Sequence, residues 1–497
     1  KVYVLNLKGN FRKFDKKEGE NIFGNSCGTT VCITFLVKNH NKLTESDVHY
    51  FEIGDGLNRT SKLEELKNKQ TYLNFVFTEI KADSNGDWLN KVNPKFSSFY
   101  SIGSKKSLDP SIFGCFYSRG ITSGKDGWVY SLDRNMLIKT MDEYVNAFNS
   151  FVDYLLKNNE FNSLKNSDDK KKFAMNCFSN SQFASIKITE EQALMAARGE
   201  KIKKENTRIL VSMFRPFVKK YCYYNKALIQ RTYRMDNLFP SDKDNIVITT
   251  TGLGGSKNLS CLVSNKIVDL NLQASGAQCY PLYWYDNSSN NYSLFGIEKD
   301  DYSIQDNVVN KFINIYNQSD IDKEMIFYYI YAVLHSERYL KSYSNNLAKE
   351  SPRIPFLNHF NKYYEIGKKL AKLHLNYEKQ PPYKGVHIKI KKQDYTVNKI
   401  KFLSKDRMDA ILFNNSIEIS NIPLKVYNYK VNGKSPIEWV LDQYQYTVDK
   451  DSGIISDPNK YDEEKGGKYI LDLILSLLTV SLETIKLIES LPPYEEI

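Results

Sequence analysis

Cysteine is scarce in this chain and is not spaced for a structural role. The 497 residues include seven cysteines, and no two of them form a C-x-x-C pair. An odd number of widely spaced cysteines argues against a disulfide framework and a structural zinc site, so we expect a reducing, cytoplasmic location. The six histidines show neither H-x-x-x-H nor H-E-x-x-H spacing, and we therefore expect no metal site.

Long apolar runs are also missing. The mean hydropathy is −0.49, and no run approaches the roughly 18 apolar residues of a membrane-spanning helix, so we expect no membrane partner. The first residue is Lys1 rather than methionine, and the segment after it is typical of a strand rather than a signal peptide. We expect the chain to begin inside a larger protein.

Complete catalytic motifs are absent as well. The segment TGLGGSKN at 251–258 lacks phosphate-loop spacing, which leaves either a hairpin turn or a loop whose backbone and Lys257 hold one DNA phosphate. The segment LPPYEEI has Leu491 where an amino-methyltransferase motif needs asparagine or aspartate. We assign no catalytic residue and no cofactor, and whether this chain acts as an enzyme stays open.

The residues that are present predict a globular α+β protein. Hydrophobic residues make up 41% of the chain and charged residues 26%, and the length suits two to four domains at roughly 100–200 residues each. Asp133 is placed to cap a long amphipathic helix. We expect strands over 1–7, 31–39, 209–214, 219–224, 246–251, 259–263 and 280–285, short strands over 384–419, and helices over 134–156, 323–340, 358–375, 437–446 and 469–491.

Positive charge is concentrated in the middle of the chain. The protein has 69 basic and 58 acidic residues, a formal charge of +11. Residues 198–234 hold eleven cations against Glu200 and Glu205, with phenylalanine and tyrosine interleaved. Cations displace counterions from phosphates and aromatic rings stack on bases, so this segment suits nucleic acid. The alternative is a solvated lysine-rich face over core aromatics.

Several collinear stretches resemble one family, the C-terminal part of type ISP restriction-modification enzymes. These enzymes combine nuclease, helicase, N6-adenine methyltransferase and target-recognition parts in one polypeptide. The resemblance lies in KVYVLNLKGN and EGENIFGNSCGTTVCITFLVKN within 1–39, SRGITSGKDGWVYSLDRN at 118–135, ILVSMFRPFVKKYCYY at 209–224, TTGLGGSKNLSCLVSNKIVDLNL at 250–272, QCYPLYWY at 278–285, DKEMIFYYIYAVLHSERY at 322–339, SPRIPFLNHF at 351–360 and VNGKSPIEWVLDQYQYTVDKDSGIISDPN at 431–459.

The resemblance implies a domain organisation. Residues 1–39 would be the last strands of the methyltransferase domain, 40–240 and 241–380 two lobes of a multi-lobed DNA target-recognition region, and 381–497 a docking region of strands and a helical end. The parent enzyme would use S-adenosylmethionine, ATP and Mg²⁺. Its upstream methyltransferase and helicase–nuclease parts would be partners of this chain, beside double-stranded DNA.

The implied function is sequence-specific recognition of double-stranded DNA, which positions an adenine for N6 methylation. The alternative is a coupling module that docks the methyltransferase to the helicase–nuclease and binds DNA without reading it. For Arg215 a structural ion pair is the competing interpretation, and for Lys125 a turn beside Asp126. We expect Trp128 and Trp284 to lie in the core rather than to stack on DNA bases. The predicted DNA contacts are Arg119, Lys125, Arg215, Lys219, Lys220, Arg231, Arg234 and Lys257.

Overall fold

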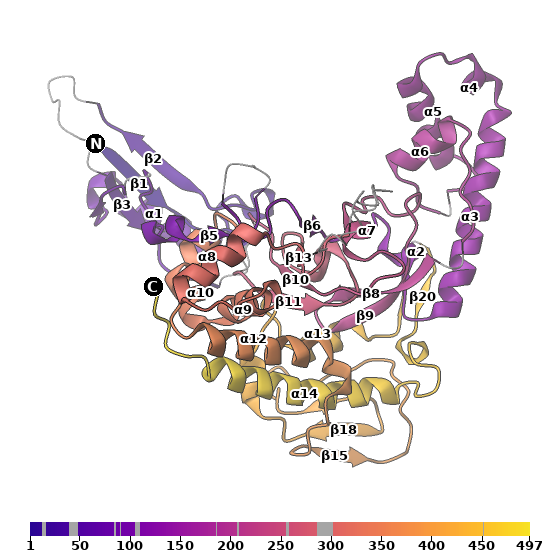
Figure 1. The fold of residues 1–497 in the computed structure, drawn as a ribbon. Helices are drawn as coiled ribbons and strands as arrows, with labels where there is room; N and C mark the ends of the chain where they lie inside the picture. The colour runs from indigo at the N-terminus through magenta and orange to yellow at the C-terminus, as the bar shows by residue number, and fades with distance from the viewer. Residues whose placement is uncertain are drawn as a thin grey trace. The chain divides into compact units, whose positions relative to one another are not determined.

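The computed structural model forms two compact units, each described here by itself. One unit comprises Lys1–Pro94, Gly254–Asn258 and Tyr343–Lys349, and the larger one Lys95–Leu253, Leu259–Ser342 and Glu350–Ile497. The mixture of small sheets and helices confirms the predicted α+β class (Figure 1). The structure describes residues 1–11, 16–38, 48–83, 86–89, 91–104, 110–184, 186–205, 208–254, 258–285, 302–450 and 452–497.

The smaller unit is built on a four-stranded sheet in the order β2-β1-β3-β4. Strand β1 pairs antiparallel with β2 and parallel with β3, and β4 pairs antiparallel with β3. The sheet thus continues well past residue 39, whereas the assignment of 1–39 to a methyltransferase stays a prediction. The elements of this unit are β1 (Val2–Asn6), β2 (Cys32–Leu36), β3 (Val48–Glu52), β4 (Thr78–Ile80), α1 (Arg59–Lys69) and α11 (Ser344–Leu347).

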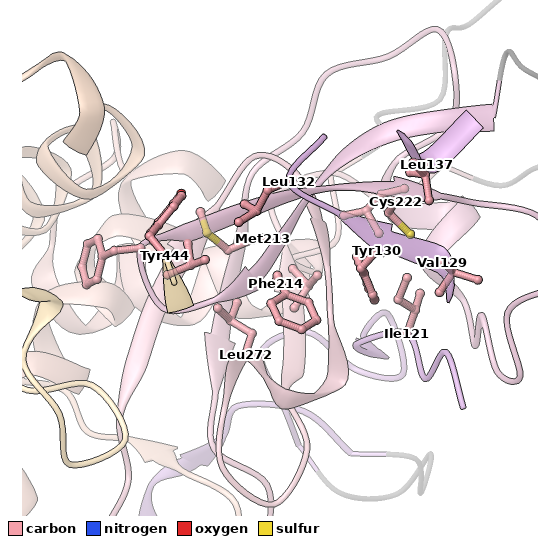
Figure 2. Packing of buried hydrophobic residues seen from close by; sticks show 14 of the residues in the cluster. Ile121, Val129, Tyr130, Leu132, Leu137, Met213, Phe214, Cys222, Leu272 and Tyr444 are labelled. Carbon is pink, nitrogen blue, oxygen red and sulfur yellow. The ribbon is translucent and has the colours of Figure 1, made fainter. Parts of the chain in front are cut away.

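Two four-stranded sheets form the centre of the larger unit. Their orders are β12-β8-β9-β7 and β11-β10-β13-β6. Figure 2 shows the packing at the first sheet, where Phe214 lies against Tyr130 with their ring centroids 4.8 Å apart. The strands are β6 (Ser118–Arg119), β7 (Tyr130–Ser131), β8 (Ile209–Arg215), β9 (Val218–Tyr223), β10 (Val247–Thr250), β11 (Cys261–Ser264), β12 (Ile267–Val268) and β13 (Gln278–Pro281).

A long helix, α3 (Arg134–Leu156), begins at the predicted cap. The Asp133 side chain accepts hydrogen bonds from the backbone N–H groups of Asn135 and Met136, which satisfies two donors that the helix itself leaves unpaired. Helices α4, α5 and α6 lie beside the C-terminal half of α3 (Figure 1). The short helices of this region are α2 (Asp126–Val129), α4 (Asn159–Ser163), α5 (Ser167–Ser179), α6 (Glu190–Ala197) and α7 (Met235–Leu238).

Six further helices complete the helical part of the larger unit, as far as the structure describes it. Gly367 lets α9 and α12 approach closely, because a Cβ atom there would lie 1.9 Å from the carbonyl oxygen of Tyr328. No helix among the described residues is long and apolar enough to cross a bilayer. The helices are α8 (Asp306–Tyr316), α9 (Lys323–His335), α10 (Glu337–Ser342), α12 (Phe360–Leu375), α13 (Pro436–Gln443) and α14 (Lys468–Glu489).

The remaining strands form small sheets in the same unit. A four-stranded sheet has the order β15-β18-β17-β16, and β5 with β14 and β19 with β20 form two-stranded pairs. The predicted short strands over 384–419 are thereby confirmed. Their bounds are β5 (Tyr100–Ser101), β14 (Arg353–Ile354), β15 (His387–Ile390), β16 (Lys401–Phe402), β17 (Ile411–Leu412), β18 (Ile417–Ser420), β19 (Thr447–Val448) and β20 (Ile455–Ser456).

Candidate nucleic-acid interface

A short loop, 231–234, is hydrogen-bonded along the segment that contains β6. Thr122 and Arg231 exchange two backbone hydrogen bonds, each 2.9 Å long. The backbone N–H of Arg234 donates to the Ser118 hydroxyl at 3.0 Å. Strand β6 itself pairs with β13. The backbone around these arginines is therefore held by the sheet, although their side chains are exposed.

Two of the exposed guanidinium groups lie over aromatic rings. The Arg119 guanidinium is 5.5 Å from the ring centroid of Tyr233, and that of Arg234 is 4.5 Å from Trp284. Arg234 also donates to the carbonyl oxygen of Cys115 at 2.7 Å. A ring beneath a guanidinium restricts its orientation and leaves its outer N–H groups available.

Arg231 completes this group. Its guanidinium is 3.1 Å from a carboxylate oxygen of Glu191, and its side chain stays 56% exposed. Three of the eight predicted contacts are thus brought to one loop and the strand beside it. We call the set Arg119, Arg231, Tyr233, Arg234 and Trp284 the arginine–aromatic cluster.

Lys125 has a different environment. The residue is only 4% exposed, and its ammonium donates hydrogen bonds to Gln192 and, at 2.7 Å, to the Tyr144 hydroxyl. Burial lowers the pKa of Lys125 to about 7, since a charge is poorly solvated there. Trp128 packs edge-on to Tyr144 and is partly buried against the core. These contacts favour a structural role for Lys125.

Arg215 forms the ion pair that was its competing interpretation. Its guanidinium donates to Asp269 at 2.7 Å, lies 3.5 Å from Asp126 and covers the Phe214 ring at 3.9 Å. The neighbouring Lys220 ammonium lies 4.1 Å from the same ring. Burial, with a smaller effect from the positive charge of Arg215, lowers the pKa of Lys220 to about 8. Both cations serve the packing of β8 and β9.

Lys219 joins β9 to the C-terminal helix. Its ammonium lies 2.5 Å from Glu378, whose other carboxylate oxygen accepts a hydrogen bond of 2.7 Å from Tyr469 of α14. The Lys219 ammonium is also 4.9 Å from the centroid of the Tyr377 ring. This arrangement occupies the lysine within the protein. Lys257 lies outside the described residues, so its predicted role stays a prediction.

The basic segment 198–234 does not present one open cationic surface. Eight of its eleven cations form ion pairs with carboxylates. Several partners are distant in sequence, such as Asp142 for Lys204 and Glu378 for Lys219. These pairs reduce the charge that the segment offers to DNA, and its convergence on DNA stays a prediction. A count of charges along the chain cannot show which carboxylates the fold brings near.

A second basic region went unnoticed in the sequence. Residues 384–407 contain eight basic and two acidic residues, a formal charge of +6. The charge count alone marks this region in the sequence, but aromatic residues are sparse there, unlike in 198–234. Within the described ranges, histidine, cysteine and carboxylate side chains form no group of three that could hold a metal ion.

Comparison with solved structures finds close matches to DNA complexes. A nuclease-deletion mutant of the Type ISP restriction-modification enzyme LlaGI, in complex with a DNA substrate mimic, is 34% identical, with a TM-score of 0.84 over 100% of this chain and 37% of that one. The ATP-dependent Type ISP enzyme LlaBIII bound to DNA has the same identity and TM-score, over 100% of this chain and 31% of that one. The DrdV–DNA complex is 25% identical, with a TM-score of 0.80 over 99% and 48%.

This chain spans about a third of the length of the LlaGI and LlaBIII chains. Curated proteins include no match to it. The Type ISP C-terminal specificity domain matches residues 111–473, which include the whole arginine–aromatic cluster and all eight predicted contacts. With the similarity to LlaGI and LlaBIII, this match shows that the chain belongs to the Type ISP C-terminal specificity domain family.

Proposed function

We propose that this chain recognises a specific double-stranded DNA sequence for a single-chain restriction-modification enzyme and positions the target adenine for N6 methylation. The observation that carries the proposal is the arginine–aromatic cluster in a member of this family. The LlaGI and LlaBIII structures, both DNA complexes, support it. Adenine must leave the base stack before methylation, and a specificity region would hold the duplex while it does so.

The cluster suits direct readout of bases. Arginine binds guanine through two parallel hydrogen bonds in the major groove, and each such pair gives about 1–3 kcal/mol of discrimination. Arg119 and Arg234 are oriented by their rings before DNA arrives, so less side-chain entropy is lost on binding. Arg231 is held by one ion pair in an exposed position and fits a phosphate contact that sets the register.

The remaining parts of the enzyme belong to the same proposal. Residues 1–39 would close the methyltransferase sheet, and every residue of β2 is exposed, which leaves an apolar strand for an upstream part to cover. S-adenosylmethionine, ATP and Mg²⁺ would be used by the upstream methyltransferase and helicase–nuclease, in the cytoplasm. Residues 40–240 and 241–380 would form the two recognition lobes, and 381–497 a docking region.

Selection from a randomised pool of duplexes tests the proposal. We expect the chain to enrich one sequence. The alanine variants of Arg119, Arg231 and Arg234 should bind that sequence more weakly, while Arg208→Ala, which removes an exposed arginine paired with Glu205, should bind it normally. Salt-dependent binding without any enrichment would instead support the coupling module.

A further inference from the structure

The sheet β15-β18-β17-β16 and its loops carry a dense set of exposed lysines. Within the described part of the chain no carboxylate forms an ion pair with any of them, in contrast to the basic segment 198–234. We call this set the lysine surface. Its members are Lys384, Lys389, Lys391, Lys392, Lys399, Lys401 and Lys405.

The nearby acidic side chains leave most of this charge uncompensated. Asp394 accepts a hydrogen bond from the backbone N–H of Thr396 at 2.9 Å. Asp409 binds Arg407 through two hydrogen bonds of 2.8 and 3.1 Å. Glu418 lies opposite Lys389 in the strand register, but the two do not form an ion pair. The local field is therefore strongly positive.

Strand pairing determines which way Lys389 and Lys401 project, because these two lie in β15 and β16. One row across the sheet is Ile388, Ile419, Ile411 and Phe402, and two of its members, Ile419 and Ile411, are fully buried. Neighbouring residues along a strand point to opposite faces, so the next row projects outward. That outward row is Lys389, Glu418, Leu412 and Lys401.

The outward row places one lysine on each edge strand. Three inter-strand spacings separate Lys389 from Lys401, about 14 Å in all. This backbone separation is close to the width of the major groove of B-DNA, about 12 Å, so ammonium groups on the two side chains are within reach of phosphates on opposite strands. The sheet fixes the backbone positions of both lysines, and this spacing suits the two parallel rows of phosphates on a duplex better than the single chain of an acidic peptide.

We infer that the lysine surface binds the phosphate backbone of duplex DNA without reading its sequence, at a contact separate from the arginine–aromatic cluster. In Figure 1, β15 and β18 lie on the far side of α14 from β8 and β9. The surface therefore holds duplex outside the bases that are read. This inference does not depend on base reading, so it stands or falls separately from the proposed function.

The test is the salt dependence of binding to a duplex of arbitrary sequence. A variant of the full chain with Lys389→Gln, Lys391→Gln, Lys392→Gln and Lys401→Gln should lose about 0.9 from the slope of log K against log salt for each phosphate contact removed, about 3.6 for all four. A second variant with arginine at the same four positions should keep the slope. A retained slope in the arginine variant would show that the positive charge is responsible. Thermal melting of both variants would show whether they are folded.

The matched control removes four lysines that are already ion-paired. Lys341, Lys425, Lys434 and Lys486 each pair with a carboxylate, so changing them to glutamine alters the net charge equally and should leave the slope unchanged. An unchanged slope in the Lys389 set would overturn the inference. Binding of polyglutamate to the same variant is measured as well. If the four Lys→Gln changes abolish polyglutamate binding and leave DNA binding intact, the inference is also overturned, because the surface then serves an acidic protein.

Discussion

The Arg215 guanidinium and the Asp269 carboxylate form a hydrogen-bonded ion pair of 2.7 Å across 54 residues of sequence. Asp269 is only 1% exposed, and it also accepts a hydrogen bond from the backbone N–H of Asn271. The pair thus joins the end of β8 to the turn after β12. Its two charges are partners of each other, which leaves Arg215 poorly suited to bind a phosphate.

We expect Arg215→Ala to destabilise the chain by about 3–5 kcal/mol, because it leaves a buried carboxylate without its partner. Urea denaturation would measure this. The control Arg208→Ala removes an exposed ion pair and should cost less than about 1 kcal/mol. Normal stability of Arg215→Ala together with lost DNA binding would show that Arg215 is a contact after all.

We expect Gly367→Ala to destabilise the larger unit by about 1–3 kcal/mol, because α9 and α12 must separate to admit the new methyl group. Thermal melting would measure the loss. Gly127→Ala is the control, since a Cβ atom at Gly127 meets only Asp449, at 3.9 Å. Equal melting temperatures for the two variants would contradict the close approach at Gly367.

Stability should fall as the pH decreases from about 6.5 toward 4. Burial lowers the pKa of His335 to about 4 and that of His374 well below its ordinary value. The unfolded chain binds protons at these histidines below about pH 6.5, whereas the folded chain does not, so each contributes up to about 1.4 kcal/mol per pH unit. Urea denaturation at several pH values would measure the slope.

Protonation of Asp269 has the opposite effect on stability over part of this pH range. Burial raises its pKa to about 6, so the folded chain takes up a proton there before the unfolded chain does. The informative comparison is therefore between slopes. His335→Gln should flatten the pH dependence, and His387→Gln, which changes an exposed side chain, should not. Identical slopes in all three proteins would disprove this account of the buried histidines.

Arg119→Lys should keep the affinity for arbitrary duplexes and lose discrimination at one base pair, by about 1–3 kcal/mol. Lysine retains the charge but lacks the planar pair of donors, and it stacks less well on Tyr233. Competition binding with single-base variants of the selected sequence would measure the change. Unaltered discrimination would assign Arg119 to a phosphate.

Local signals in the sequence were sufficient for several elements. The helix predicted over 134–156 has those bounds, because a capping aspartate and a regular apolar face both lie within its own residues. The helix predicted over 323–340 is instead interrupted at Ser336, whose backbone is extended between α9 and α10. The apolar spacing continues through this interruption, so the pattern contained no sign of it.

The site was less accessible to prediction than the fold. Arg119, Arg231 and Arg234 are exposed and come together, although only Arg231 and Arg234 belong to the basic segment 198–234. Lys219 looks equivalent in sequence, yet its partner Glu378 is 159 residues away. Partners so distant depend on the tertiary packing of β9 against the C-terminal region, and composition cannot reveal them.

The three clustered arginines project from a two-residue edge strand and a short loop, none of which supplies the apolar interior. Exchange of these side chains would change only surface contacts and leave the apolar interior intact. Under the proposed function, new target preferences would therefore arise by single substitutions during evolution, or by design, while the scaffold beneath them is inherited unchanged.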